Sequence, residues 1–141
     1  MTRAAARLIA IALLMTSAPA GAEHEVYYRY VVIGYVNDPK GQPIKGRTVE
    51  VMRDKTGFSY LAETDAQGLY VAVTRLGDES AGETLTVKVG TLVHTVTAQF
   101  DPANHADDRG TRLDVAGTKF VERPTWFPST LGRFLGERGH P

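Results

Sequence analysis

Residues 84–100 read Thr84-Leu-Thr-Val-Lys-Val-Gly90-Thr-Leu-Val-His-Thr-Val-Thr-Ala-Gln-Phe100. In the first part of this stretch, Leu85, Val87 and Val89 alternate with polar residues, and a period of two places them on one face of a β-strand. Gly90 then permits a tight connection. Beyond it the alternation returns, with one face formed by Leu92, Val96, Ala98 and Phe100. The stretch therefore predicts two consecutive strands joined by a short turn.

The same period of two recurs along the rest of the chain, between clusters of turn-forming residues. It predicts five further strands, at about 26–36, 48–52, 58–64, 69–74 and 111–115. No window sustains the longer period of an amphipathic helix. Each strand has one apolar face to hide, so we expect an all-β fold, a seven-stranded antiparallel β-sandwich of two packed sheets.

The N-terminus has the three parts of a secretory signal peptide. It begins with Arg3 and Arg7, continues with an uncharged apolar run from Leu8 to Met15, and ends in small residues up to Ala22. The apolar run is much shorter than the roughly 20 residues that span a bilayer, so we expect cleavage near Ala22 rather than a retained anchor. No later stretch is a candidate transmembrane segment. The sequence therefore predicts Sec-dependent export to the periplasm or the medium.

Composition narrows the class of partner. Removing residues 1–22 takes away two arginines and no acid, which leaves 14 basic against 16 acidic residues and a net charge of −2. Such a domain offers no electrostatic attraction to nucleic acid or anionic lipid. The chain has no cysteine, which excludes thiolate metal sites, c-type haem attachment and thiol catalysis. We therefore expect a protein partner in the cell envelope, and the oligomeric state stays open.

The C-terminal residues 118–141 differ in character from the predicted sandwich, residues 23–117. Pro124 and Pro128 interrupt regular structure, so we expect an irregular segment with at most a short helix over 130–137. Three interpretations are open: the segment folds back over the edge or end of the sandwich, it docks on another protein, or it is disordered. The candidate partner contact consists of its large apolar side chains, Trp126, Phe127, Leu131, Phe134 and Leu135.

Two blocks of sequence carry a family resemblance. They are Ile33-Gly-Tyr-Val-Asn-Asp-Pro-Lys-Gly-Gln-Pro-Ile-Lys-Gly-Arg-Thr-Val-Glu-Val51 and Thr64-Asp-Ala-Gln-Gly-Leu-Tyr70. Together they resemble the carboxypeptidase regulatory-like domains, which are prealbumin-like (transthyretin-like) β-sandwiches found in exported bacterial proteins. The resemblance implies the same sandwich and an accessory, non-catalytic role.

The hallmark residues of these blocks also have a structural explanation of their own. Glycine permits backbone angles that side chains resist, proline holds the chain extended before a strand, and aspartate accepts hydrogen bonds from the amides of its own turn. We expect Tyr70 to begin a strand and to cover the edge of the core. The hallmark set is Gly41, Pro43, Gly46, Asp65, Gly68 and Tyr70.

Enzymatic chemistry has little support in the sequence. The prealbumin-like family includes the hydroxyisourate hydrolases, which use a C-terminal Tyr-Arg-Gly-Ser, whereas this chain ends Gly136-Glu-Arg-Gly-His-Pro141. The serines that remain after signal cleavage lie outside any Gly-x-Ser-x-Gly motif. We therefore predict that the protein is not an enzyme and needs no cofactor.

Metal binding is the main alternative of another class. His24 falls second in the predicted mature chain, where the free α-amino group can join it in a copper or nickel site. Calcium is a further possibility at Asp101, Asp107 and Asp108, although their spacing is not that of an EF-hand. A carbohydrate-binding face is suggested by the tyrosines of the first strand, Tyr27, Tyr28, Tyr30 and Tyr35. Our preferred prediction is an exported, non-catalytic binding or scaffold module, an accessory subunit of an envelope or extracellular complex.

Overall fold

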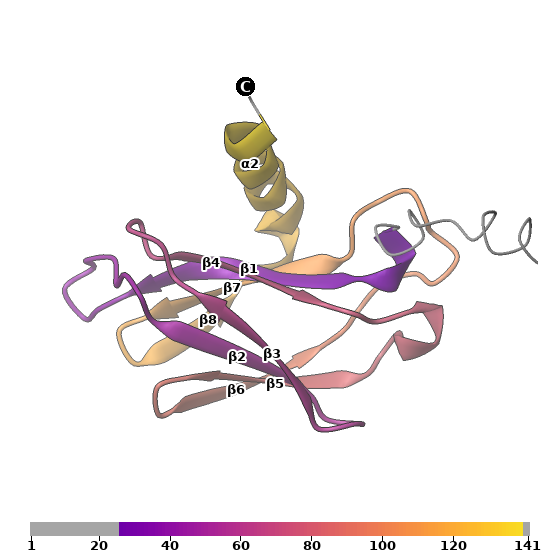
Figure 1. Cartoon of the computed structure of the whole chain (residues 1–141), viewed down its shortest axis with the longest axis horizontal. Helices are drawn as coiled ribbons and strands as arrows, with labels where there is room; N and C mark the ends of the chain where they lie inside the picture. Colours follow the sequence, from indigo (N-terminus) through magenta and orange to yellow (C-terminus); the bar gives the residue numbers. More distant parts are fainter. Residues whose placement is uncertain (1–25, 140–141) are drawn as a thin grey trace, which may run out of the picture.

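The computed structural model describes residues 26–139, and their side chains as far as residue 136. Eight strands form two four-stranded sheets, so the protein is a β-sandwich (Figure 1). The strands are β1 (Tyr30–Asn37), β2 (Thr48–Arg53), β3 (Phe58–Glu63), β4 (Leu69–Thr74), β5 (Thr84–Val89), β6 (Leu92–Thr97), β7 (Gly110–Ala116) and β8 (Lys119–Glu122). The helical elements are the 3₁₀ turns η2 (Val26–Tyr28), η3 (Asp78–Ser80) and η4 (Pro124–Trp126), and helix α2 (Phe127–Gly139).

The order of strands is β4-β1-β7-β8 in one sheet and β3-β2-β5-β6 in the other. Most neighbouring strands are antiparallel, but β1 and β7 pair in parallel, with Val31 opposite Gly110 and Val36 opposite Val115. The prediction of a purely antiparallel sandwich was therefore wrong. The reason is topological, because the chain between β1 and β7 passes through the other sheet before it returns beside β1.

The apolar side chains that alternate along the strands form the core between the two sheets, as predicted. Leu85, Val87 and Val89 are at most 2% exposed, as the period of two requires. In β4 the same period divides the strand, so that Tyr70 and Ala72 face the core while Leu69 and Val71 face outward. Strand assignment from periodicity was thus confirmed for these elements.

Helix α2 covers the outward face of the sheet that contains β1. Phe127 and Leu131 are buried against Val31 and Ile33 and form a second, smaller hydrophobic cluster. Because β1 has apolar side chains on both faces, one face packs in the sandwich and the other packs under α2. Figure 1 shows α2 standing on this sheet, with its C-terminal end directed away from the strands. No helix within residues 26–139 combines the length and apolar character that crossing a bilayer requires.

Three details of the predicted architecture need correction. The chain has an eighth strand, β8, within the segment expected to be irregular, because Gly117 at φ 67° turns the chain back onto β7. The first strand begins at Tyr30, since the amide of Arg29 closes a turn onto the carbonyl of Val26. The C-terminal segment is helical from Phe127, because a proline in the first turn of a helix removes no intrahelical hydrogen bond.

The two hallmark blocks lie against each other beside β1. Gly68 has φ 80°, its carbonyl accepts the amide of Val36 at 2.8 Å, and a Cβ on it would approach the Val36 oxygen to 2.7 Å. Asp65 Oδ1 accepts the amides of Gln67 and Leu69 at 2.8 and 3.0 Å, as expected for its turn. Left-handed angles are also found at Gly41 and Gly46, and a bridge joins Asn37 to Pro43. The contacts of these residues stabilise the turns beside β1, so we interpret the hallmark set as structural.

Candidate functional site

A cluster of charged residues lies on the outward face of β7, beside the start of α2. Arg112 and Asp114 are two residues apart on the strand and so share this face. Arg112 Nε donates to both carboxylate oxygens of Asp114 at 3.1 Å, and Arg123 Nε donates to Asp114 Oδ2, also at 3.1 Å. The backbone amide of Tyr35 donates to Asp114 Oδ1 at 2.9 Å. One nearly buried carboxylate therefore holds two guanidinium groups and strand β1 together.

Trp126 lies over these arginines. Its ring centroid is 4.5 Å from the guanidinium carbon of Arg123 and 5.1 Å from that of Arg112, both within the range of cation–π attraction. Arg112 also lies 5.1 Å from the centroid of the Tyr35 ring. Although it makes these contacts, Trp126 remains 48% exposed, so a large aromatic surface faces solvent.

The cluster has an excess of positive charge. Arg133 of α2 lines the same cavity as Arg112, and three guanidinium groups against the single carboxylate of Asp114 leave a net charge of +2. We call Arg112, Arg123, Trp126 and Arg133 the arginine–tryptophan surface. Aromatic and arginine side chains are the types that dominate binding energy at protein interfaces.

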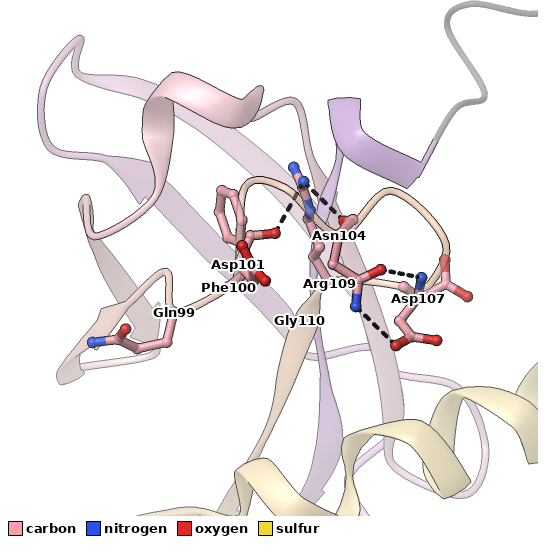
Figure 2. Close-up of a pocket in the computed structure, with 8 residues that line it drawn as sticks. Gln99, Phe100, Asp101, Asn104, Asp107, Arg109 and Gly110 are labelled. Atoms are coloured by element: carbon pink, nitrogen blue, oxygen red, sulfur yellow. Dashed lines mark hydrogen bonds between the residues drawn. The ribbon is translucent and has the colours of Figure 1, made fainter.

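A second cluster surrounds Arg109, whose side chain is 3% exposed, at the other end of β7 (Figure 2). Its Nη2 donates to Asp78 Oδ1 at 2.9 Å and to the carbonyl of Asn104 at 3.2 Å, and its guanidinium carbon lies 4.2 Å from the Phe100 centroid. Its Nη1 donates to the carbonyl of Tyr27 at 3.2 Å. Arg109 thus ties the segment before β1, η3 and the loop before β7 to one another.

The partners of Arg109 explain the electrostatics of Asp78. His105 Nε2 lies 2.8 Å from Asp78 Oδ2 and adds a second contact to this carboxylate. Partial desolvation raises the pKa of the Asp78 carboxylate, but the hydrogen bonds from Arg109 and His105 outweigh this effect, so the pKa is lower than usual. The adjoining cavity, about 180 Å³, is lined mainly by residues of this loop. We interpret the cluster as a structural feature that holds these three segments together.

The three predicted calcium ligands, Asp101, Asp107 and Asp108, all line the cavity beside Arg109, but their side chains are not grouped as metal ligands. Asp101 Oδ1 accepts the amide of Ala103 at 2.9 Å, and Asp107 accepts the side-chain amide of Asn104 at 2.9 Å. Asp108 pairs with Arg29 at 2.9 Å. Within the described residues, no three His, Cys, Asp or Glu side chains are grouped so that they could hold a metal ion. Each carboxylate instead has a partner within the protein, and His24, the predicted copper or nickel ligand, lies outside the described residues.

The predicted partner contact divides into two parts. Phe127 and Leu131 are 3% and 7% exposed and belong to the interior, and Phe134 packs against the same cluster. Trp126 and Leu135 are 48% and 50% exposed. The segment therefore folds back on the sandwich through Phe127 and Leu131, whereas docking on another protein stays a prediction, for which Trp126 and Leu135 are the exposed candidates.

The tyrosines of the predicted carbohydrate face are not on one surface. Tyr30 is 1% exposed and lies in the core, while Tyr27 packs against the His105 ring with centroids 4.4 Å apart. Tyr28 is exposed on η2, and Tyr35 contacts Arg112. Tyr70 is not at the edge of the core either, since it is 1% exposed and its hydroxyl donates to the carbonyl of Leu113 at 2.5 Å. Burial raises the pKa of this hydroxyl.

Sequence reasoning missed the arginines of the surface. The signal that was available is the Arg112-x-Asp114 spacing, which places opposite charges on one face of a strand. Arg123 and Arg133 belong to other elements, and only the packing of β8, η4 and α2 brings them near β7.

Comparison with known proteins gives no family assignment. No family model and no curated protein matches the chain. Among solved structures, it is similar to the dioxygenase domain of a dioxygenase–carbohydrate-binding protein fusion from Streptomyces sp. SirexAA-E, with TM-score 0.37, 20% identity and coverage of 67% of this chain and 75% of that one. It is also similar to catechol 1,2-dioxygenase from Acinetobacter radioresistens, with TM-score 0.37, 19% identity and coverage of 67% of this chain. The chain spans only 45% of the latter protein. Likeness at this level describes a partial match of backbone and says nothing of activity.

Proposed function

We propose that this protein is an exported, non-catalytic binding module, of the carboxypeptidase regulatory-like type, that docks on a protein of the cell envelope through its arginine–tryptophan surface. The proposal combines the secretory signal peptide predicted for residues 1–22 with the surface at the start of α2. The observation that carries it is the exposure of Trp126, at 48%, beside guanidinium groups that are already held in place.

The rigidity of this surface supports a role in recognition. Arg112 and Arg123 are fixed by Asp114, and Thr130 Oγ1 accepts a further hydrogen bond from Arg112 Nη1 at 3.2 Å. Side chains that are fixed before binding lose less conformational entropy when a partner arrives. Below them, Phe127 and Leu131 hold the start of α2 on the sheet, so the backbone that carries Trp126, at the end of η4, and Arg133, in α2, is fixed in place.

The test is affinity capture from detergent-solubilised envelope, with the partner identified by mass spectrometry. The tagged protein is compared with Trp126→Ala and with Leu61→Ser, because Leu61 is 70% exposed on the outer face of the other sheet and controls for general loss of apolar surface. We expect one envelope protein to be retained by the parent protein and by Leu61→Ser, and to be lost with Trp126→Ala. Equal retention by all three proteins, or capture that depends on Leu61, would contradict the proposed docking surface.

A further inference from the structure

A cavity of about 210 Å³ opens between β1, β7 and α2. It is lined by Tyr35, Arg112, Ser129, Thr130 and Arg133. Ser129, Thr130 and Arg133 of α2 line the cavity, whereas Phe127 and Leu131 of the same helix pack into the interior. The cavity therefore lies within the arginine–tryptophan surface, next to Trp126.

Hydrogen-bond donors exceed acceptors around this cavity. Both oxygens of Asp114 already accept from Arg112, and the backbone amide of Tyr35 and Arg123 Nε complete their contacts. The hydroxyls of Ser129 and Thr130 donate to the carbonyl of Trp126 at 3.2 and 2.6 Å. Guanidinium groups only donate, and a negatively charged acceptor complements them best because charge-assisted hydrogen bonds are the stronger ones.

Among the described residues that line the cavity, Arg133 has the most unused hydrogen-bond donors. Its side chain is exposed, and it makes no hydrogen bond or ion pair with any residue that the structure describes. Arg112, by contrast, uses part of its guanidinium on Asp114 and Thr130. The planar guanidinium of an arginine binds a carboxylate through two parallel hydrogen bonds.

The size of the cavity limits the ligand. Sites for whole cofactors or drug-sized molecules usually occupy about 300–1,000 Å³, more than is present here. A cavity of 210 Å³ instead accommodates one short side chain. The neighbouring indole of Trp126 offers apolar contact for the rest of a larger ligand, which favours a peptide segment over a free anion.

We propose that this cavity binds the carboxylate of an acidic side chain in an extended segment of the partner protein, with Arg133 as the principal ligand and Arg112 as the second. The inference rests on the proposed function and names the chemistry that the partner must present. Because the rest of the protein is slightly acidic, this local positive charge also selects against segments rich in lysine or arginine.

The experiment uses the purified protein and a blocked tetraglutamate peptide, with blocked tetraglutamine as the uncharged probe. Trp126 is the only tryptophan, so its fluorescence reports binding at the site without a label. Arg133→Gln is compared with Arg75→Gln, which removes the same charge from an exposed residue outside the cavity lining. Neither variant disturbs a buried residue, so both are expected to fold.

We expect tetraglutamate to change the emission of Trp126 and tetraglutamine to leave it unchanged. Arg133→Gln should weaken tetraglutamate binding about tenfold, the loss expected for one charge-assisted pair, and Arg75→Gln less than about twofold. Equal binding by both variants would overturn the assignment to Arg133. Displacement of the peptide by an equal concentration of inorganic phosphate would show a general anion site and overturn the carboxylate assignment. If the peptide fails while Trp126-dependent capture persists, the cavity inference is wrong and the docking surface stands.

Discussion

Replacement of Phe127 by alanine tests whether α2 is part of the folded domain. The Phe127 side chain is 3% exposed and packs with Leu131 on Val31 and Ile33. Truncating a buried phenylalanine costs about 3 kcal/mol or more, through lost transfer free energy and the cavity that remains. For Trp126→Ala, which removes two partly exposed cation–π contacts, we expect a loss of about 1 kcal/mol.

Urea unfolding gives the two changes in the free energy of unfolding and thermal unfolding gives the two changes in Tm, both followed by far-ultraviolet circular dichroism. At this chain length about 3 kcal/mol corresponds to a fall in Tm of about 12 °C, and about 1 kcal/mol to about 4 °C. Far-ultraviolet dichroism is required because Trp126→Ala removes the only tryptophan. A Phe127→Ala variant no less stable than Trp126→Ala would refute the docking of α2, and with it the division of the C-terminal segment into buried and exposed halves.

Three further predictions concern the framework. The hydrogen bond from Arg53 lowers the pKa of Glu83 from 4.5 to about 2, although burial acts in the opposite direction. Above pH 4.5 the Glu83→Gln variant should therefore have a free energy of unfolding about 1–3 kcal/mol lower than the parent protein. Because the pKa of Glu83 is lower in the folded than in the unfolded protein, this difference should shrink as the pH falls from 4.5 toward 2. Urea unfolding at a series of acidic pH values measures it, and a difference that stays constant would exclude the Arg53–Glu83 pair as its source. Gly68→Ala should lower the free energy of unfolding by at least about 3 kcal/mol, and Gly41→Ala by about 1 kcal/mol, as measured by thermal unfolding. Both glycines have positive φ, but only at Gly68 would a Cβ meet a backbone oxygen, so equal losses would contradict this contact. Arg109→Ala should speed amide hydrogen exchange about tenfold in residues 100–108, and unchanged protection there would show that Arg109 does not hold the loop.

The sandwich was predictable because its signal is local. In Leu69–Thr74, alternate residues identify the strand and its two faces, and the structure places Tyr70 and Leu69 on opposite sides as the pattern requires. β8 was not predictable in this way, since a four-residue strand with one apolar pair is too short to show a period. The parallel pairing of β1 with β7 depends on contacts between distant parts of the chain, which no local pattern reports.

The candidate surface was predictable only in part. Apolar residues after Pro124 indicated a contact segment, but the pattern did not separate Phe127, which is interior, from Trp126, which is exposed. That difference arises because α2 turns one face to Val31 and Ile33. The arginines are a tertiary feature, since they come from β7, from the residue after β8 and from α2, and gather around Asp114 and the cavity only in the folded protein.

Site-specific photo-crosslinking in intact cells tests the central claim most directly. A benzophenone amino acid is placed at position 126 in one protein and at position 61 in a second. Both positions are exposed: position 126 lies in η4 beside Arg112 of β7, and position 61 lies in β3 of the other sheet. The account predicts a discrete crosslinked adduct with one envelope protein from position 126 and none from position 61. Equal adducts from both positions, an adduct from position 61 alone, or no adduct from either position would contradict docking through the arginine–tryptophan surface.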